Sequence, residues 1–234
     1  MVPGITEREP LDAQGQRRHL LTWGADLPVA AVTTTALITL AWTLYRAMTD
    51  LPGWTDALVA KPLLWLGPVL LAVALVERRP RPWLSLSPSR PRPGHGLAIL
   101  GRDLALGAGA AALLAAWVLR GHELHPVSVY GPLVWPLATA AVEETLYRGY
   151  LMARLWAWCG DAWTANLLSA AAFALIHLPL LVLDQGQGLV EALTTLRTIL
   201  ALGIGLGWLF GRTRGLAAPI AAHAVWDGAV TWFG

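Results

Sequence analysis

The sequence contains one cysteine and few charged residues. Only 14% of its 234 residues are Asp, Glu, Lys or Arg, whereas 56% are hydrophobic. A single cysteine, Cys159, cannot form an intrachain disulfide, and it excludes a metal site built from several thiolates. Soluble domains have about 25% charged residues. The low charge and the mean hydropathy of +0.52 therefore favour a polytopic helical membrane protein.

Three motifs of intramembrane protease classes are also absent. The sequence has no H-E-x-x-H of a zinc metalloprotease, no G-x-G-D of the presenilin-type aspartyl enzymes and no G-x-S-G of the rhomboid type. It shows no internal repeat either, so nothing supports a transporter built from inverted repeats. Any hydrolytic chemistry in this chain must use other residues.

Seven apolar stretches approach the roughly 20 residues that a transmembrane helix needs. They lie near residues 27–49, 62–77, 97–119, 131–155, 163–183, 189–210 and 216–233. An eighth helix could lie at 120–130 or in the tail of the fourth stretch. The predicted fold is all-α, with about seven or eight transmembrane helices around a polar cavity open towards the cytoplasm and the lateral lipid.

The basic residues predict the orientation of these helices. Seven crossings place four arginine-containing segments on one side: residues 1–26, residues 77–102, Arg148 with Arg154, and Arg212 with Arg214. The opposite loops contain only Lys61 and Arg120. The positive-inside rule then places the N-terminus in the cytoplasm and the C-terminus outside, in the cell (inner or cytoplasmic) membrane. This distribution explains the pI near 9.0, so no nucleic-acid partner is expected.

Composition divides the chain into three parts. Residues 1–26 form a cytoplasmic N-terminal segment, and residues 27–130 supply scaffold helices. Within the scaffold, the Pro- and Arg-rich stretch 77–96 is expected to be an extended cytoplasmic loop that contacts anionic lipid headgroups, because dense proline prevents a helix. Residues 131–234 form the membrane core that contains the residues suited to catalysis.

Two adjacent glutamates lie in the fourth apolar stretch. A carboxylate at the centre of a transmembrane helix costs about 2.5 to 3.5 kcal/mol on insertion scales, so such residues usually face a polar interior and have a function. Glu144 and Arg148 share a helix face in the favourable order for an ion pair. Glu143 lies about 100° around the helix, and with no second cation in the motif it is expected to be an unpaired carboxylate facing a cavity.

Two later stretches contain further polar residues at helical spacing. Phe173 and His177 are one turn apart and precede Pro179, which bends a helix and makes room for a cavity. His223 and Asp227 are also one turn apart. A buried carboxylate and imidazoles that converge can activate water, and a further polar group must then stabilise the oxyanion. Alternatively, His177, His223 and Asp227 could hold one zinc ion with an open position for water.

These residues form three motifs that resemble one protein family. The stretches are Glu143-Glu144-Thr-Leu-Tyr-Arg148, Phe173-Ala-Leu-Ile-His177 and His223-Ala-Val-Trp-Asp227. They are similar to the E-E-x-x-x-R, F-x-x-x-H and H-x-x-x-N/D motifs of the CPBP intramembrane metalloproteases, which include type II CAAX prenyl endopeptidases and Abi bacteriocin-immunity proteins. Each motif alone is weak, but all three in order are specific. The resemblance covers about residues 131–233.

The resemblance implies a role for each matched residue. Glu143 and His177 resemble the pair that activates water, and Glu144 with Arg148 resembles the ion pair that supports the site. His223 and Asp227 resemble the pair that stabilises the oxyanion or, in a metal-dependent account, binds the metal.

Two matched positions need comment. Phe173 is expected to pack beside the site. The best-known prenyl endopeptidases carry Asn at the position of Asp227. An ionised Asp227 would repel an oxyanion, so it must be protonated, pair with a cation or bind metal.

The expected function is intramembrane proteolysis by glutamate-activated water. The substrate would be a peptide or protein in or at the lipid bilayer, and a prenylated CAAX-type substrate if the parallel holds in full. Two alternatives stay open: a noncatalytic membrane protein that confers bacteriocin self-immunity, and a proton-coupled transporter that uses Glu143 as its relay. The sequence indicates no oligomeric state.

Overall fold

The computed structural model describes residues 26–49, 51, 53–77, 96–118 and 130–233, and every regular element in these ranges is a helix. The predicted all-α fold is confirmed, and the helices form seven segments. These are α2 (Asp26–Met48); α3 (Gly53–Thr55), η1 (Asp56–Ala60), η2 (Pro62–Leu66) and α4 (Gly67–Leu75); α5 (Gly96–Val118); α6 (Tyr130–Glu144), η4 (Thr145–Met152) and α7 (Ala153–Cys159); α8 (Ala162–Leu175) and η5 (Leu180–Asp184); α9 (Leu189–Thr213); and α10 (Ala217–Phe233), where η marks wider, π-helical turns. The suggested eighth helix at 120–130 lies almost wholly outside the described residues.

The second segment begins earlier than the sequence predicts. It starts at Gly53 and not near residue 62, so Lys61 lies within a helical segment and not in a loop. The predicted start was wrong because Asp56 and Lys61 interrupt the apolar run on which the prediction depends. Asp56 is instead paired with Arg46 of α2, and Lys61 is paired with Glu143. Charges neutralised by other helices need not end a helix.

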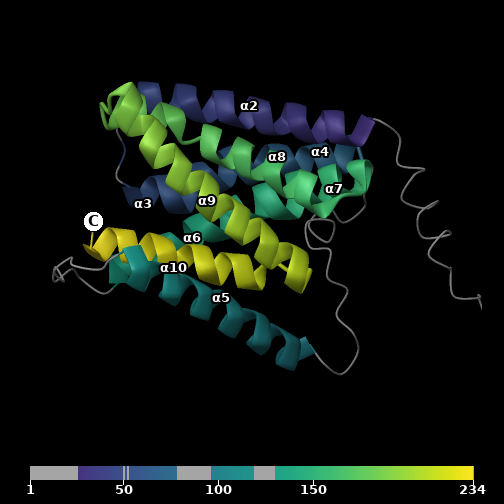
Figure 1. Ribbon diagram of the computed structural model, residues 1–234. Coiled ribbons are helices and arrows are strands. Elements are labelled where there is room, and N and C mark those ends of the chain that lie inside the picture. Colours follow the sequence, from purple (N-terminus) through teal and green to yellow (C-terminus); the bar gives the residue numbers. More distant parts are fainter. Residues whose placement is uncertain (1–25, 50, 52, 78–95, 119–129, 234) are drawn as a thin grey trace, which may run out of the picture.

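The helices form one bundle in which α9 crosses between two groups (Figure 1). On one side, α2 packs against α4 and α7. On the other side, α5 packs along α10, and α10 also contacts α6. Helix α8 packs against α9. The fourth, fifth and seventh helical segments, which carry the three motifs, therefore meet inside the bundle.

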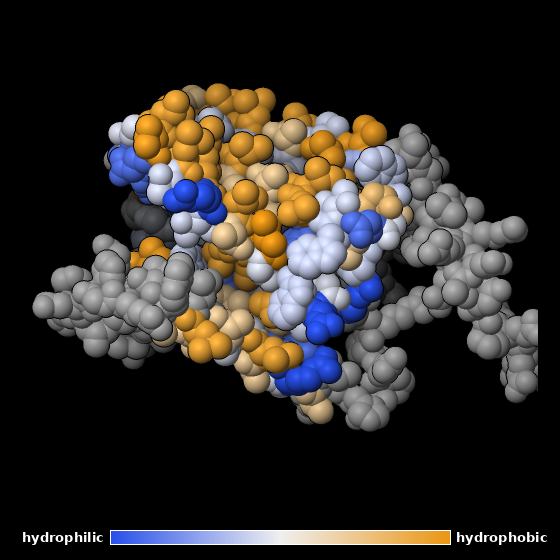
Figure 2. All heavy atoms as spheres, viewed as in Figure 1, coloured by the Kyte–Doolittle hydropathy of each residue, from blue (hydrophilic) through white to orange (hydrophobic). Residues whose placement is uncertain are grey.

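The outer surface of several helices is apolar. Four segments are long and hydrophobic enough to cross a membrane: Pro28–Met48, Gly53–Leu75, Ala162–Asp184 and Leu189–Thr213. Large apolar side chains on α2, such as Leu37 and Leu40, are more than half exposed. Figure 2 shows hydrophobic residues spread over much of this face of the molecule. An apolar outer surface of this kind is suited to contact with lipid. Because several helices are also long enough to cross the bilayer, the chain is a multi-pass membrane protein.

A row of aromatic rings runs through the core from α2 to the later helices. The ring centroids of Trp42 and Trp65 are 5.5 Å apart, those of Trp65 and Tyr147 are 6.2 Å apart, and those of Tyr147 and Phe173 are 5.2 Å apart. All three contacts are edge-to-face, which is a favoured geometry for aromatic pairs. The scaffold helices are therefore packed directly against the helices that carry the motifs.

Glycines permit the closest helix contacts. A Cβ at Gly107 of α5 would lie 2.2 Å from the backbone oxygen of Ala218 in α10. A Cβ at Gly207 of α9 would lie 1.8 Å from Oδ1 of Asn166 in α8. Small residues at such positions let membrane helices approach closely, which increases their van der Waals contact.

We expect Gly107→Ala to destabilise the protein, because its methyl group would push α10 away from α5. Overpacking of this kind costs about 1 to 3 kcal/mol. Gly109→Ala on the same helix is the matched control, since nothing lies within 4 Å of its Cβ position, and alanine is the better helix former. Thermal unfolding of the purified protein in one detergent checks this. A midpoint for Gly107→Ala equal to or above that of Gly109→Ala would contradict the close contact.

Candidate active site

The first motif lies at the junction of α6 with the π-helical turns of η4. Arg148 Nη1 donates to Glu144 Oε1 at 2.8 Å, which confirms the predicted ion pair. Arg148 Nη2 donates to the backbone oxygen of Gly203 in α9, also at 2.8 Å. The guanidinium lies 4.7 Å from the Phe173 ring centroid. Both members of the ion pair are at most 1% exposed, so the pair links three helical segments in the interior.

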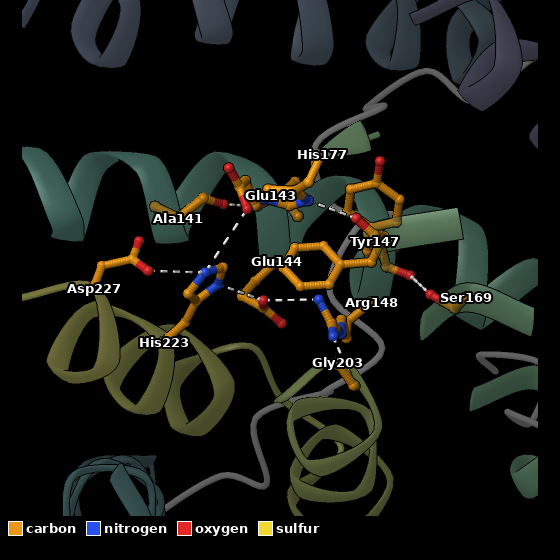
Figure 3. A network of polar contacts seen from close by, with 12 residues as sticks. Ala141, Glu143, Glu144, Tyr147, Arg148, Ser169, His177, Gly203, His223 and Asp227 are labelled. Carbon is orange, nitrogen blue, oxygen red and sulfur yellow. Dashed lines mark hydrogen bonds and ion pairs between the residues drawn. The ribbon is translucent and has the colours of Figure 1, made fainter. Parts of the chain in front are cut away.

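Glu144 also contacts the third motif. His223 Nδ1 lies 2.8 Å from Glu144 Oε1, and both side chains are buried. An ionised carboxylate only accepts hydrogen bonds, so Nδ1 carries the proton and donates it to this bond. The bond orients the imidazole and directs Nε2 to the opposite side (Figure 3). Glu144 thus supports two side chains, whereas the sequence predicts only its pair with Arg148.

Glu143 has a cationic partner that the sequence analysis missed. Lys61 Nζ donates to Glu143 Oε1 at 2.5 Å. The prediction that Glu143 is unpaired is therefore wrong. Lys61 is the only lysine in the chain, and its ammonium lies 5.2 Å from the ring of Trp65 and 5.6 Å from that of Trp42. Cation–π attraction from both rings helps hold the ammonium beside the carboxylate.

The second carboxylate oxygen of Glu143 has a different environment. Oε2 is buried and has no hydrogen-bond partner among the described residues. It lies 3.7 Å from His223 Nε2. A polar contact of this length is the kind that a water molecule bridges. One oxygen of Glu143 is thus neutralised by Lys61, and the other is an open acceptor beside an imidazole.

The remaining motif residues lie around this carboxylate. His177 Nδ1 donates to the backbone oxygen of Phe173 at 2.7 Å, because a carbonyl can only accept. The other ring nitrogen is thereby left as an acceptor, and Figure 3 shows the His177 ring beside Glu143. The Phe173 ring packs edge-on against both imidazoles, with centroids 5.0 and 5.6 Å away. Its expected packing role is confirmed.

Asp227 lies at the more open end of the cluster. Its Oδ1 is 3.5 Å from His223 Nε2, and its side chain is 28% exposed, compared with 3% for His223. A protonated His223 would supply the cation that an ionised Asp227 needs. All three motifs therefore meet in one cluster, as the sequence predicts (Figure 3).

The zinc site considered from the sequence stays a prediction. Within the part of the chain that the structure describes, no three His, Cys, Asp or Glu side chains are grouped so that they could share a metal ion. The ammonium of Lys61 also occupies the position beside Glu143 Oε1 where a cation would bind. Both nitrogens of His223 face carboxylates. The side chains are arranged as a network of ion pairs and hydrogen bonds.

Comparison with protein families gives a match that covers the three motifs. Residues 125–229 match the family model described as type II CAAX prenyl endopeptidase Rce1-like. The chain contains an Rce1-like domain. The matched range includes all three motifs but not Lys61, and it supports the CPBP and CAAX protease family. Searches of curated proteins and of solved structures found no match.

The sequence carries one signal that could have revealed Lys61. A lone lysine followed by Pro62 interrupts an otherwise apolar run, and the insertion cost of a charged residue applies to it as it does to Glu143. A buried cation and a buried anion in different helices are natural partners. The sequence does not say which helices are neighbours, so the pairing of residues 82 positions apart could only be a hypothesis.

We expect Lys61→Met and Glu143→Gln to be energetically coupled in folding stability. Lys61→Met leaves an unpaired buried carboxylate, and this penalty is absent when residue 143 is already neutral. A double-mutant cycle from thermal or denaturant unfolding should give a coupling energy of about 1 kcal/mol or more, within the range of roughly 0.5 to 3 for contacting residues. The matched control pairs Lys61→Met with Glu191→Gln, an exposed acid of α9, where additivity is expected. Additivity in both cycles would exclude the Lys61–Glu143 contact.

Proposed function

We propose that this protein is an intramembrane endopeptidase in which Glu143 activates a water molecule. The observation that carries the proposal is the asymmetry of the Glu143 carboxylate. Lys61 binds Oε1, whereas buried Oε2 has no hydrogen-bond partner among the described residues and faces His223 Nε2 at 3.7 Å. The Rce1-like family match supports a protease. Glu144 Oε2 also lacks a hydrogen-bond partner among the described residues, but it is the free oxygen of Glu143 that lies beside His223 Nε2. The family resemblance assigns water activation to this same carboxylate.

In the proposed reaction, a water molecule binds to Glu143 Oε2 and transfers a proton to it. The water oxygen attacks the carbon of the scissile carbonyl, whose oxygen becomes an oxyanion. When this intermediate collapses, the C–N bond breaks and the leaving amine takes the proton from Glu143. General-base catalysis by a positioned side chain contributes about 10²- to 10⁴-fold to a rate. His177, with its free ring nitrogen near Glu143, assists by accepting or passing the proton.

The oxyanion is stabilised by positive charges or N–H hydrogen-bond donors that lie close to the carbonyl oxygen. Lys61 supplies an ammonium beside Glu143, and an N–H on His223 Nε2 would be a second donor. Asp227, 3.5 Å from that nitrogen, then acts as a partner of His223. This pairing reduces the repulsion that a free carboxylate would exert on an oxyanion. The mechanism needs no metal ion.

The substrate we propose is a membrane-associated peptide or protein. The apolar outer surface and the buried site favour a substrate that is delivered from the bilayer. The family match supports, as a narrower proposal, a CAAX-type segment with a prenylated cysteine. We further propose that the protein lies in the inner (cytoplasmic) membrane with a cytoplasmic N-terminus, on the basis of the arginine distribution.

We expect Glu143→Gln to lower the rate of peptide hydrolysis by at least about 10²-fold, because the amide cannot accept a proton from water. His177→Ala should have a similar effect. Hydrolysis of a farnesylated CAAX peptide and of its unprenylated counterpart by the purified protein is the measurement. Glu191→Gln is the control and should keep full activity. Each variant must show a thermal transition like that of the wild type.

The same assay separates the proposed function from its rivals. Activity that persists in Glu143→Gln would refute the mechanism. A folded wild-type protein without hydrolysis of any supplied peptide would instead favour the noncatalytic immunity role or transport.

Metal removal gives an independent prediction. We expect dialysis against a chelator to leave the rate of hydrolysis unchanged within about twofold, since ion pairs and hydrogen bonds hold the cluster together and general-base chemistry suffices. Elemental analysis of the same sample should find less than one zinc ion per chain. Loss of activity on chelation, restored by added zinc, would show that the side chains rearrange to bind metal.

A further inference from the structure

A hollow of about 290 Å³ lies between α7, α8 and α9, away from the ion-pair cluster. Its walls combine aromatic and basic side chains with one buried amide: Trp156, Trp163, Asn166, Trp208, Arg212 and Arg214. We call it the Trp–Arg hollow. Its volume equals that of about ten water molecules at roughly 30 Å³ each. It is therefore large enough for a phosphate-containing group.

The two arginines of the hollow are held in place but keep their hydrogen-bond donors available. The Arg214 guanidinium lies 3.9 Å from the ring centroid of Trp156, and that of Arg212 lies 5.5 Å from the ring centroid of Trp208. Such an interaction uses the face of a guanidinium, whereas its N–H groups point outward in the plane. The structure gives neither arginine a carboxylate partner among the described residues, in contrast to Arg148 and Arg154.

The backbone at Arg214 strengthens the case for a specific role. Arg214 ends α9 in a left-handed conformation, with φ of 56°, and it is the only described non-glycine residue with positive φ. This conformation is unfavourable for a residue with a Cβ, because the Cβ comes too close to the following carbonyl oxygen. Gly215 follows directly and would adopt it freely. The strained arginine places a guanidinium against Trp156, where it lines the hollow.

The surroundings identify the kind of ligand. The hollow is formed by the end of α7, the start of α8 and the end of α9. These helix ends lie on the side where basic residues and tryptophans gather in the predicted orientation. In Figure 2, pale and hydrophilic residues gather at this end, next to the hydrophobic surface. Tryptophan and arginine concentrate at the level of lipid headgroups, and the cytoplasmic leaflet is anionic.

The floor of the hollow links it to the helix contact between α8 and α9. Asn166 is 2% exposed, and its Nδ2 donates to the backbone oxygen of Ile204 at 3.0 Å. Gly207 lies against this amide and also lines the hollow. A molecule bound above this floor would contact α7, α8 and α9 at once.

We propose that the Trp–Arg hollow binds the phosphate headgroup of an anionic phospholipid. Arg212 and Arg214 donate to the phosphate oxygens in charge-assisted hydrogen bonds. The tryptophans contact the glycerol and the first methylene groups, and the acyl chains lie on the apolar surface of α8 and α9. Because the lipid binds three helices of the folded state, it stabilises that state by mass action. The proposal is independent of the proteolytic function.

The test uses the full-length protein in a neutral detergent, with dioleoyl phosphatidylglycerol as the probe. Its titration should raise the thermal unfolding midpoint, whereas dioleoyl phosphatidylcholine and inorganic phosphate at equal concentrations should leave it unchanged. In Arg212→Gln/Arg214→Gln, the apparent Kd for phosphatidylglycerol should rise about tenfold or more, because both charge-assisted hydrogen-bond donors are lost. Arg197→Gln, an exposed arginine of α9, is the matched control and should bind like the wild type.

Three results would overturn the proposal. An equal shift in the double variant and in the wild type would show that binding does not use the hollow. An equal shift with phosphatidylcholine would show that charge is not recognised. An equal shift with inorganic phosphate would identify a site for free anions and not for lipid. If the double variant does not fold, Arg212→Gln and Arg214→Gln are measured singly, and each should weaken binding.

Discussion

The burial of two adjacent carboxylates is the constraint on which the rest of the structure depends. Glu143 is 2% exposed and Glu144 is fully buried. Breaking a buried ion pair by removing one partner costs about 3 to 5 kcal/mol of stability. Each carboxylate therefore needs a cationic side chain or an N–H hydrogen-bond donor from elsewhere in the chain. Lys61, Arg148 and His223 satisfy this requirement from the second, fourth and seventh helical segments. Charge neutralisation thus determines which helices become neighbours.

Packing then sets the distances within which these charges can meet. The aromatic row from Trp42 to Phe173 holds the second segment against η4 and α8, and it ends on the two imidazoles of the cluster. On the other side of Arg148, Gly203 has no side chain, so the α9 backbone can lie close to Phe173 of α8 and to the Arg148 guanidinium. A Cβ there would lie 3.1 Å from the Phe173 ring, and the carbonyl of Gly203 accepts from Arg148. The same close approach therefore serves both apolar packing and the polar network.

Sequence reasoning succeeded where the relevant geometry is local. The Glu144–Arg148 pair depends only on helical spacing, and even the π-helical turns of η4 preserve it. The bend expected at Pro179 lies between α8, which ends at Leu175, and η5, which begins at Leu180. Pairings between distant residues depend on which helices are adjacent, and no spacing rule encodes that. For this reason Lys61 was assigned to a loop, and His223 was expected beside Glu143, whereas its shorter contact is to Glu144.

The unequal surroundings of the two glutamates explain why only one of them suits proton transfer. Both glutamates have a free, buried Oε2, but Glu144 Oε1 is shared by Arg148 and His223. Protonation of Glu144 would therefore remove the negative charge beside two buried partners that hold α9 and α10. Glu143 is bound through one oxygen, and its partner Lys61 also interacts with two aromatic rings. Transient protonation of its other oxygen leaves that contact in place. A carboxylate that can gain and lose a proton without breaking the helix packing is the one that can act repeatedly as a base.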